Sequence, residues 1–142
     1  AKYSLMTEIK QTNISENKKM YTLRGFHFQY PPHDENKVIS CVKGSIYNIV
    51  VDLRKESNTF MKWQSFDLTE ENRLSIYVPQ GCANAYLTLQ DNTWILYYHS
   101  EFYAPGNEGS ICYNDPLFKF HWPAVPKVIS DKDLNIPDWP TK

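Results

Sequence analysis

Short runs in which apolar and polar residues alternate recur along this chain and constrain its fold more than any other feature. A period of two suits an extended strand, whereas an amphipathic helix needs apolar residues every three to four positions. No convincing helical pattern precedes the proline-rich end. The chain is therefore predicted to be all-β. The predicted strands are Val38–Val42, Ile46–Leu53, Trp63–Leu68, Leu74–Val78, Ala85–Leu89 and Thr93–Tyr98.

Short polar connectors separate these strands. Residues that tolerate tight turns occur at Lys43–Gly44, Lys55–Asn58 and Gln90–Asn92, so we expect neighbouring strands to pair as antiparallel hairpins. A domain with many strands must cover its sheet edges, which favours a barrel or a two-sheet jelly roll. Near the end, Pro137 and Pro140 predict an extended tail that covers the fold.

Length and charge exclude several classes of protein. The 142 residues suit one domain with a single sizeable core, so residues 1–142 are predicted to form one domain. The net charge of -1, with both signs mixed, provides no basic surface for nucleic acid. No apolar run approaches the roughly 18 residues that a membrane span needs. We therefore expect a small-molecule or protein partner, and neither nucleic acid nor membrane.

The first residues and the cysteines favour a cytoplasmic protein. Residues 1–7 lack the apolar segment of a secretory signal. Cys41, Cys82 and Cys112 are odd in number and form no C-x-x-C pair. This pattern predicts reduced thiols, each buried as a small apolar side chain, rather than a disulfide framework.

The segment Pro79–Asn84 resembles the Pro-x-Gly-x-x-His turn of cupin jelly rolls, except that Asn84 replaces the histidine. Metal-binding cupins combine that histidine with a His-x-His pair and a glutamate. Here no His-x-His occurs, and the four histidines are scattered without ligand spacing. The sequence therefore predicts no metal site, and nothing in it indicates an organic cofactor.

Three basic side chains interrupt sequence that otherwise suits buried strands. The segment Leu23–Gln29 reads Leu-Arg-Gly-Phe-His-Phe-Gln and contains Arg24 and His27, and Pro31–Pro32 and Lys37 follow it. Such side chains are poor material for a core, so they indicate a functional role.

The order of these residues resembles the signature of the dTDP-4-dehydrorhamnose 3,5-epimerases, cofactor-free enzymes that move protons beside a sugar ketone. The resemblance covers nearly the whole chain, from about Gln11 to Asp133, and its segments follow the family order. The matching segments are Gln11–Ser15, Val50–Arg54, Ser57–Phe60, Tyr103–Pro105, Glu108, Asn114–Pro116, His121–Pro123 and Ile129–Asp133.

The resemblance implies a set of catalytic residues. His27 corresponds to the catalytic base, Asp133 to the acid that orients it, and Tyr97 to the general acid on the opposite sugar face. Lys37 corresponds to a cation beside the ketone. The chemistry needs such a set, because the developing enolate oxygen requires a fixed cation and inversion requires a base and an acid on opposite faces. Without the resemblance, His27 and Tyr97 are packing residues and Asp133 is suited to cap a turn.

The resemblance also implies a set of substrate-binding residues. Strict alternation would place two of them, Arg24 and His27, on opposite faces of one strand, so a bulge at Gly25 is expected if both line one pocket. The residues assigned to substrate binding are Arg24, Gln29, Asn13, Ser15, Asn48, Asn84, Tyr103 and Glu108.

The chain departs from the family pattern at two positions and at its start. Asn48 replaces an aspartate and Asn84 replaces a histidine, and neutral amides cannot act as acid and base. The sequence also begins after the family's N-terminal strands, which carry an Arg-Gly segment that helps to hold the nucleotide across a dimer. The match is therefore weakest for nucleotide recognition.

The sequence thus predicts a cupin-type jelly roll, a double-stranded β-helix, that epimerises carbon 3, carbon 5 or both of a nucleotide-linked 4-keto-6-deoxyhexose. The resemblance implies a nucleotide-sugar substrate, a homodimer and a surface-polysaccharide pathway. Two alternatives remain: a 3,4-ketoisomerase acting on the same kind of substrate, and a non-catalytic module that binds sugar nucleotides.

Overall fold

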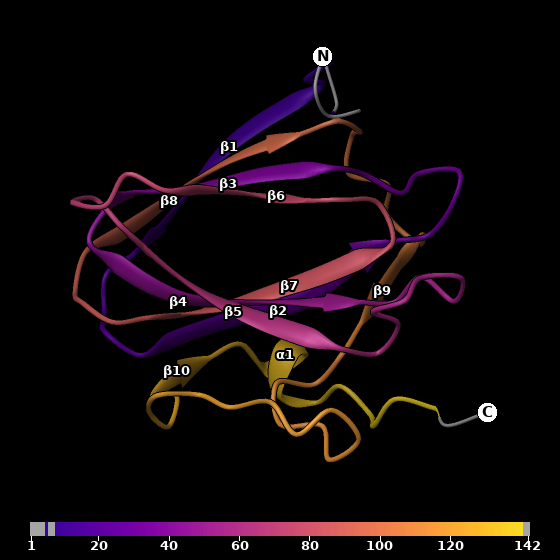
Figure 1. Cartoon of the computed structure of the whole chain (residues 1–142). Helices are drawn as coiled ribbons and strands as arrows, with labels where there is room; N and C mark the ends of the chain where they lie inside the picture. Colours follow the sequence, from indigo (N-terminus) through magenta and orange to yellow (C-terminus); the bar gives the residue numbers. More distant parts are fainter. Residues whose placement is uncertain (1–4, 6–7, 141–142) are drawn as a thin grey trace.

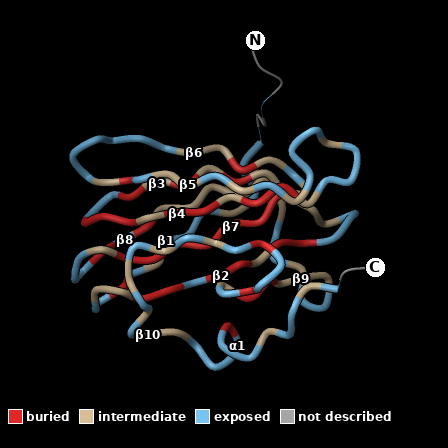
Figure 2. Tube along the Cα trace, turned by 60° about the horizontal axis from the view of Figure 1, so that its bottom comes forward, coloured by how far each residue is buried: buried red, intermediate tan, exposed pale blue. Residues whose placement is uncertain are grey.

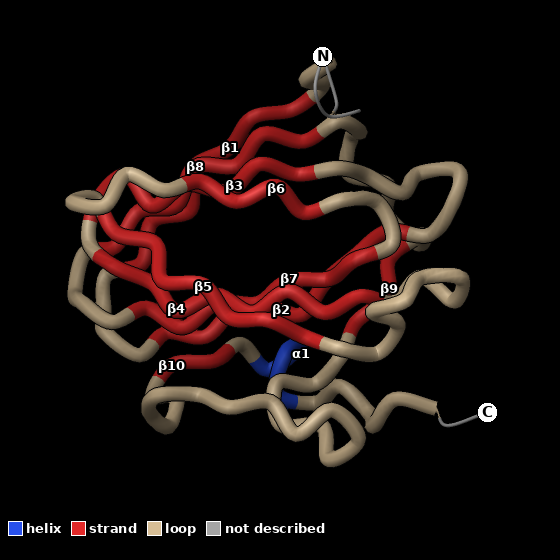
Figure 3. Tube along the Cα trace, viewed as in Figure 1, coloured by secondary structure: helices blue, strands red, loops and turns tan. Residues whose placement is uncertain are grey.

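Two β-sheets face each other and form the body of the molecule (Figures 1 and 3). The computed structural model describes residue 5 and residues 8–140. One sheet has the order β1 (Gln11–Asn17), β8 (Thr93–His99), β3 (Lys37–Lys43) and β6 (Ser75–Val78). The other has the order β10 (Val128–Ile129), β2 (Thr22–Gln29), β7 (Cys82–Thr88), β4 (Ser45–Asp52) and β5 (Trp63–Thr69). Strand β9 (Glu108–Ser110) also pairs with β2, and the helix α1 (Asp131–Leu134) lies near the end of the described chain.

This architecture confirms the predicted all-β, cupin-type jelly roll. Each predicted strand run coincides with one of β3 to β8. Two further strands, β1 and β2, carry the segments that the resemblance singled out. No helix among the described residues is long and apolar enough to span a membrane.

Two of the three predicted hairpins are wrong. Lys55–Asn58 does connect the paired strands β4 and β5. At Lys43–Gly44 and Gln90–Asn92, however, the chain crosses from one sheet to the other, because β3 and β8 lie in one sheet and β4 and β7 in the other. Turn residues determine where a chain reverses, but burial determines which strands pair. Strands β4 and β7 are buried along most of their lengths and therefore occupy inner positions of their sheet (Figure 2).

Apolar clusters cover both faces of the larger sheet. The inner cluster lies between the two sheets and includes Ile39, Ile46, Leu68, Tyr86 and Ile95. The outer cluster lies between the larger sheet and the C-terminal segment, which runs beneath that sheet in Figure 1. The tail therefore covers the fold, as its prolines predicted. The outer cluster contains Phe26, Phe28, Ile49, Val51, Ala83, Ala85, Ile111 and Phe118, with Phe120, Trp122 and Trp139 packed against it.

The cysteines are buried free thiols, as predicted. Cys41 and Cys82 belong to the cluster between the sheets. Burial raises the pKa of each of these two thiols to about 11, so both remain protonated at neutral pH. They therefore pack as small apolar side chains.

A bulge in β2 determines which face of the sheet its polar side chains occupy. The register between β2 and β7 shifts between Gly25 and His27, which confirms the bulge expected from the sequence. Gly25 has a φ of +115°, and a Cβ built there would lie 2.6 Å from the backbone oxygen of Asn84. Only glycine fits such a position. The extra residue places Arg24 and His27 on one side of the sheet.

Gly25→Ala is predicted to destabilise the protein by more than about 2 kcal/mol, because it adds a backbone clash to an unfavourable φ. Chemical denaturation measures the change. Gly106→Ala is the matched control, since Gly106 also has a positive φ, of +86°, but a Cβ there meets no atom within 4 Å. Equal losses of unfolding free energy in the two variants would contradict a role for the close approach of β2 and β7.

Candidate active site

Two adjoining cavities of about 420 and 350 Å³ share five lining residues: Asn13, His27, Lys37, Tyr97 and Lys132. We refer to the two cavities together as the cleft. Every site residue predicted from the sequence lines the cleft except Asn48. Those that line it are Asn13, Ser15, Arg24, His27, Gln29, Lys37, Asn84, Tyr97, Tyr103, Glu108 and Asp133.

A third cavity, of about 910 Å³, adjoins the cleft. It shares Phe28, Gln29 and Lys132 with the cleft and extends beneath the tail, along residues 135–140. None of the residues assigned a catalytic role lines this larger cavity.

His27 and Asp133 form a close pair at the centre of the cleft. His27 Nε2 lies 2.8 Å from Asp133 Oδ1, and the Asp133 side chain is only 6% exposed. Asp133 lies in the first turn of α1, whose N-cap is Ser130, and its Oδ2 accepts a hydrogen bond of 3.3 Å from the Gly25 N–H. The helix and the bulge therefore fix the carboxylate from two sides.

The surroundings of Asp133 keep it ionised. Burial alone would raise the pKa of this carboxyl, but the His27 ring, the Gly25 N–H and Ser130 more than offset burial and hold its pKa below the usual value. An ionised carboxylate only accepts hydrogen bonds, so a neutral His27 carries its proton on Nε2. Its Nδ1 then bears the lone pair that can accept a proton. The Ser110 hydroxyl lies 3.2 Å from that nitrogen.

Lys37 brings a buried amine into the cleft. Its Nζ donates to Asn84 Oδ1 at 3.2 Å and lies 3.5 Å from the backbone oxygen of His27. Burial lowers the pKa of Lys37, and the carboxylate of Glu35, 3.7 Å away, acts in the opposite direction. The ammonium group is thus held between the β2 strand that carries His27 and the loop that carries Glu35.

Asn48 does not reach the cleft. It is fully buried on β4, and its side-chain amide lies 3.4 Å from the amide nitrogen of Asn84. Any effect of Asn48 on a ligand would therefore act through Asn84, which does line the cleft.

Tyr97 and Arg24 lie on two different strands that border the cleft. Burial is the main cause that raises the pKa of Tyr97 well above its usual value; Tyr86 adds to this effect and Arg24 opposes it. The Tyr97 hydroxyl is therefore protonated and able to donate. Arg24 Nε donates to Asn17 Oδ1 at 2.8 Å, which holds the guanidinium in place. Ser15 Oγ lies 3.1 Å from Tyr86 Oη in the same polar group.

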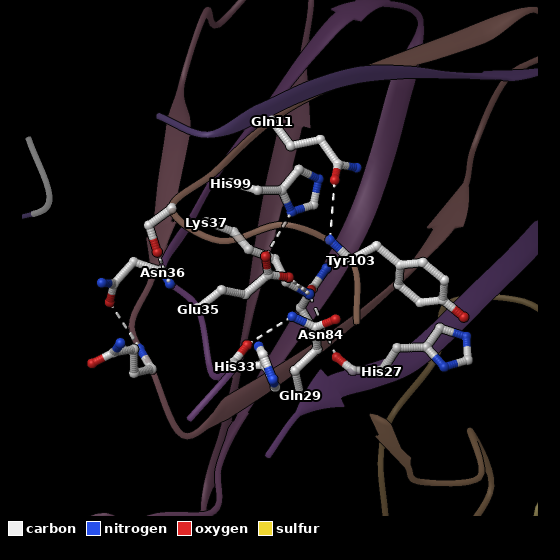
Figure 4. A network of polar contacts seen from close by, with 12 residues as sticks. Gln11, His27, Gln29, His33, Glu35, Asn36, Lys37, Asn84, His99 and Tyr103 are labelled. Atoms are coloured by element: carbon white, nitrogen blue, oxygen red, sulfur yellow. Dashed lines mark hydrogen bonds and ion pairs between the residues drawn. The ribbon is translucent and has the colours of Figure 1, made fainter. Parts of the chain in front are cut away.

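Polar contacts join strand β2 to the loops beside the cleft (Figure 4). Gln29 Nε2 donates to the backbone oxygen of His33 at 2.7 Å, and its Oε1 accepts from the Ala104 N–H at 2.7 Å. Gln29 therefore holds two loops together. Tyr103 Oη donates to Glu108 Oε1 at 3.0 Å, so these two predicted residues form one side of the rim.

Sequence reasoning assigned no site role to several residues of the cleft and its border, among them Glu35, His99 and Ser110. His99 follows Tyr97 by two positions on β8, so strand alternation alone places both on one face and could have identified His99. Glu35 lies in a loop and Ser110 on a short strand, where no periodic pattern indicates which way a side chain points. Among the described residues, no three His, Cys, Asp or Glu side chains are grouped so that they could hold a metal ion.

Comparison with known proteins identifies the family of this chain. A family model described as dTDP-4-dehydrorhamnose 3,5-epimerase matches residues 1–140. The chain belongs to this family. It is 38% identical over 135 residues to the dTDP-4-dehydrorhamnose 3,5-epimerase of Mycobacterium tuberculosis (strain CDC 1551 / Oshkosh), covering 93% of this chain and 66% of the relative. The chain thus spans about two thirds of that relative's length.

Solved structures of family members superimpose closely on this chain. The Bacillus anthracis str. Ames enzyme, crystallised with TDP and PPi, gives a TM-score of 0.90 at 34% identity, covering 93% of this chain and 75% of that one. A 3'-monoepimerase from Streptomyces bikiniensis, in complex with dTDP-quinovose, gives a TM-score of 0.85 at 32% identity, covering 92% of this chain and 66% of that one. The family fold is therefore shared over nearly all of this chain.

Proposed function

We propose that this chain epimerises carbon 3, carbon 5 or both of a nucleotide-linked 4-keto-6-deoxyhexose, without a cofactor. The observation that carries the proposal is the convergence of a His27–Asp133 pair, a buried lysine and a protonated tyrosine on one cleft. Family membership and the dTDP-quinovose bound to the Streptomyces bikiniensis relative support a nucleotide-sugar substrate.

Each residue has a distinct role in this reaction. His27 Nδ1 removes the proton beside the ketone, while Asp133 holds the ring and stabilises the imidazolium that forms. Lys37, as an ammonium ion, stabilises the negative charge that develops on the enolate oxygen. Tyr97 then donates a proton to the opposite face of the carbon, and its raised pKa keeps it protonated until that step. Arg24 and Asn84 contact the hydroxyl groups of the sugar.

We further propose that the protein is a cytoplasmic homodimer in polysaccharide biosynthesis. Three free thiols support a reducing compartment. Strand β1 is an edge of its sheet, and Ile14 on it is 54% exposed, so a second copy could cover this edge.

The environment of Asn84 favours epimerisation at one carbon. Inversion of two carbons requires the pocket to exchange protons at both sides of one ketone. Asn84 contacts Lys37 where the family pattern has a histidine, and Asn48 lies behind it where the pattern has an aspartate. An amide pair still forms hydrogen bonds to a sugar hydroxyl, but it cannot relay a proton. The Streptomyces bikiniensis relative is itself named a 3'-monoepimerase.

In deuterated water, the protein is predicted to incorporate solvent deuterium beside the ketone of a dTDP-4-keto-6-deoxyhexose, and NMR locates the label. His27→Asn should slow incorporation by at least about 10²-fold because it removes the base. His121→Asn is the control, because His121 is exposed and lines neither cavity of the cleft, and it should exchange at the parent's rate. A parent that binds the nucleotide without exchange would indicate a binding module, and a 3-keto product would indicate a ketoisomerase. Rapid exchange in His27→Asn would rule out His27 as the base.

Carbon 3 and carbon 5 are predicted to exchange at unequal rates in the parent, because Asn48 and Asn84 cannot relay a proton. The double variant Asn48→Asp, Asn84→His should accelerate exchange at the slower carbon, and each single variant serves as its control. Rates are measured separately at each carbon by NMR. Equal parental rates would contradict the prediction, and a double variant without gain would show that these positions do not control the outcome.

A further inference from the structure

The carboxylate of Glu35 is buried in the cleft, although the reaction described above assigns it no role. Glu35 lies in the loop between β2 and β3, and its side chain is only 10% exposed. Burying a carboxylate costs several kcal/mol unless its oxygens are paired. Here each oxygen has its own partner: Oε1 lies 3.7 Å from Lys37 Nζ, and Oε2 lies 3.1 Å from His99 Nδ1. Figure 4 shows the Glu35 side chain reaching to the His99 ring.

On one side, Glu35 supplies the counter-charge for Lys37. The other acceptors near Lys37 Nζ are neutral: the Asn84 amide oxygen and the backbone oxygen of His27. Within the described part of the chain, Glu35 is the one carboxylate that forms an ion pair with Lys37. A buried amine without a counter-charge loses its proton readily, and a neutral amine stabilises an enolate far less than an ammonium ion does.

On the other side, Glu35 orients His99. Lys37 and His99 lie directly opposite each other on the paired strands β3 and β8, and the carboxylate bridges them. His99 Nε2 contacts Asn13 Oδ1 at 2.6 Å, so both ring nitrogens are held. The His99 ring lies nearly parallel to that of Tyr97, at an angle of 14° and a centroid distance of 5.6 Å. Fixing His99 therefore restricts the ring of Tyr97.

We propose that Glu35 is a positioning residue of this active site. It keeps Lys37 protonated and, through His99, fixes the orientation of the Tyr97 ring. The inference rests on the proposed function. One carboxylate thereby aligns the group that stabilises the enolate with the group that returns the proton. It also supplies a pairing of acid and imidazole beside Lys37, in a chain where Asn48 and Asn84 provide neither.

Several other charged or titratable groups line the cleft together with Lys37, and a test of Glu35 must distinguish its effect from theirs. In addition to Glu35, the elements β2, β8, β9 and α1 and the loop that carries Tyr103 contribute them. These groups are Arg24, His27, Tyr97, His99, Tyr103, Glu108, Lys132 and Asp133.

Glu35→Gln retains the size of the side chain but removes its charge. It is predicted to slow deuterium exchange by about tenfold or more, with substrate binding retained. The pKa of Lys37 is already lowered by burial, and removing Glu35 removes an influence that raises it. Lys37 therefore loses its proton at lower pH in the variant, and the basic limb of the kcat profile moves to lower pH. NMR titration of the Lys37 Cε–Hε signals, assigned with Lys37→Arg, measures this shift without substrate.

Asp34→Asn is the matched control, because it removes a charge from the adjacent position, which lines the larger cavity rather than the cleft. It should leave both exchange and the Lys37 titration unchanged. If Glu35→Gln does not fold, Glu35→Asp withdraws the charge by one methylene group and should produce a smaller shift in the same direction. An unchanged Lys37 midpoint in the folded variant would overturn the inference. Absence of exchange in the parent, with a shifted midpoint in the variant, would overturn the proposed function instead.

Discussion

The packing of the C-terminal segment against the outer face of the larger sheet is the interaction on which the rest of the structure depends. Phe118, Phe120 and Trp139 pack on the cluster that contains Phe26 and Phe28 of β2. Phe26 and Phe120 stack with ring centroids 4.5 Å apart. Burial of an aromatic side chain of this kind contributes about 1.5–3 kcal/mol, so several of them fix the path of the tail.

This packing also brings Asp133 to the cleft. The same segment leads through β10, which pairs with β2, to α1 and Asp133. On β2, Phe26 points into the outer cluster, while its neighbour His27 lines the cleft. Strand alternation separates these two neighbours, and the bulge at Gly25 brings Arg24 to the same side as His27. The Gly25 N–H also donates to the Asp133 carboxylate. Core packing and the His27–Asp133 pair are therefore two consequences of one contact between strand and tail.

Burial and local partners together set the protonation states of the cleft residues on which the proposed proton transfer depends. Tyr97 remains protonated because burial disfavours its anion, whereas Asp133 remains ionised because His27, Gly25 and Ser130 outweigh burial. Burial also lowers the pKa of Lys37, and Glu35 opposes that effect. These groups share surroundings of low polarity but differ in protonation state, because each has different hydrogen-bonding and charged partners.

The sequence predicted the strands and most of the site, for reasons that particular residues illustrate. Alternation revealed β3 to β8 because it reflects burial directly, but the turns at Lys43–Gly44 and Gln90–Asn92 did not reveal that the chain changes sheet there. The bulge at Gly25 was predictable because Arg24 and His27 are three positions apart, and alternation alone would put them on opposite faces of the strand.

The residues that sequence reasoning missed depend on contacts between distant segments. Glu35 and His99 are separated by 64 residues in the chain, and His27 and Ser110 by 83. Neither pair has a spacing that a local pattern could indicate. Asn48 was assigned to the substrate site by its position in the motif. It lies on β4, which pairs with β7, and it is fully buried behind Asn84. A motif position does not reveal such burial.

The position of a bound sugar tests the central claim most directly. A crystal structure with dTDP-quinovose, which lacks the ketone and is not turned over, would place the hexose. We expect carbon 3 or carbon 5 to face His27 Nδ1 and the oxygen on carbon 4 to lie about 3 Å from Lys37 Nζ. A hexose bound in the larger cavity beneath the tail, with neither His27 nor Lys37 in contact, would contradict the assignment of the cleft as the active site.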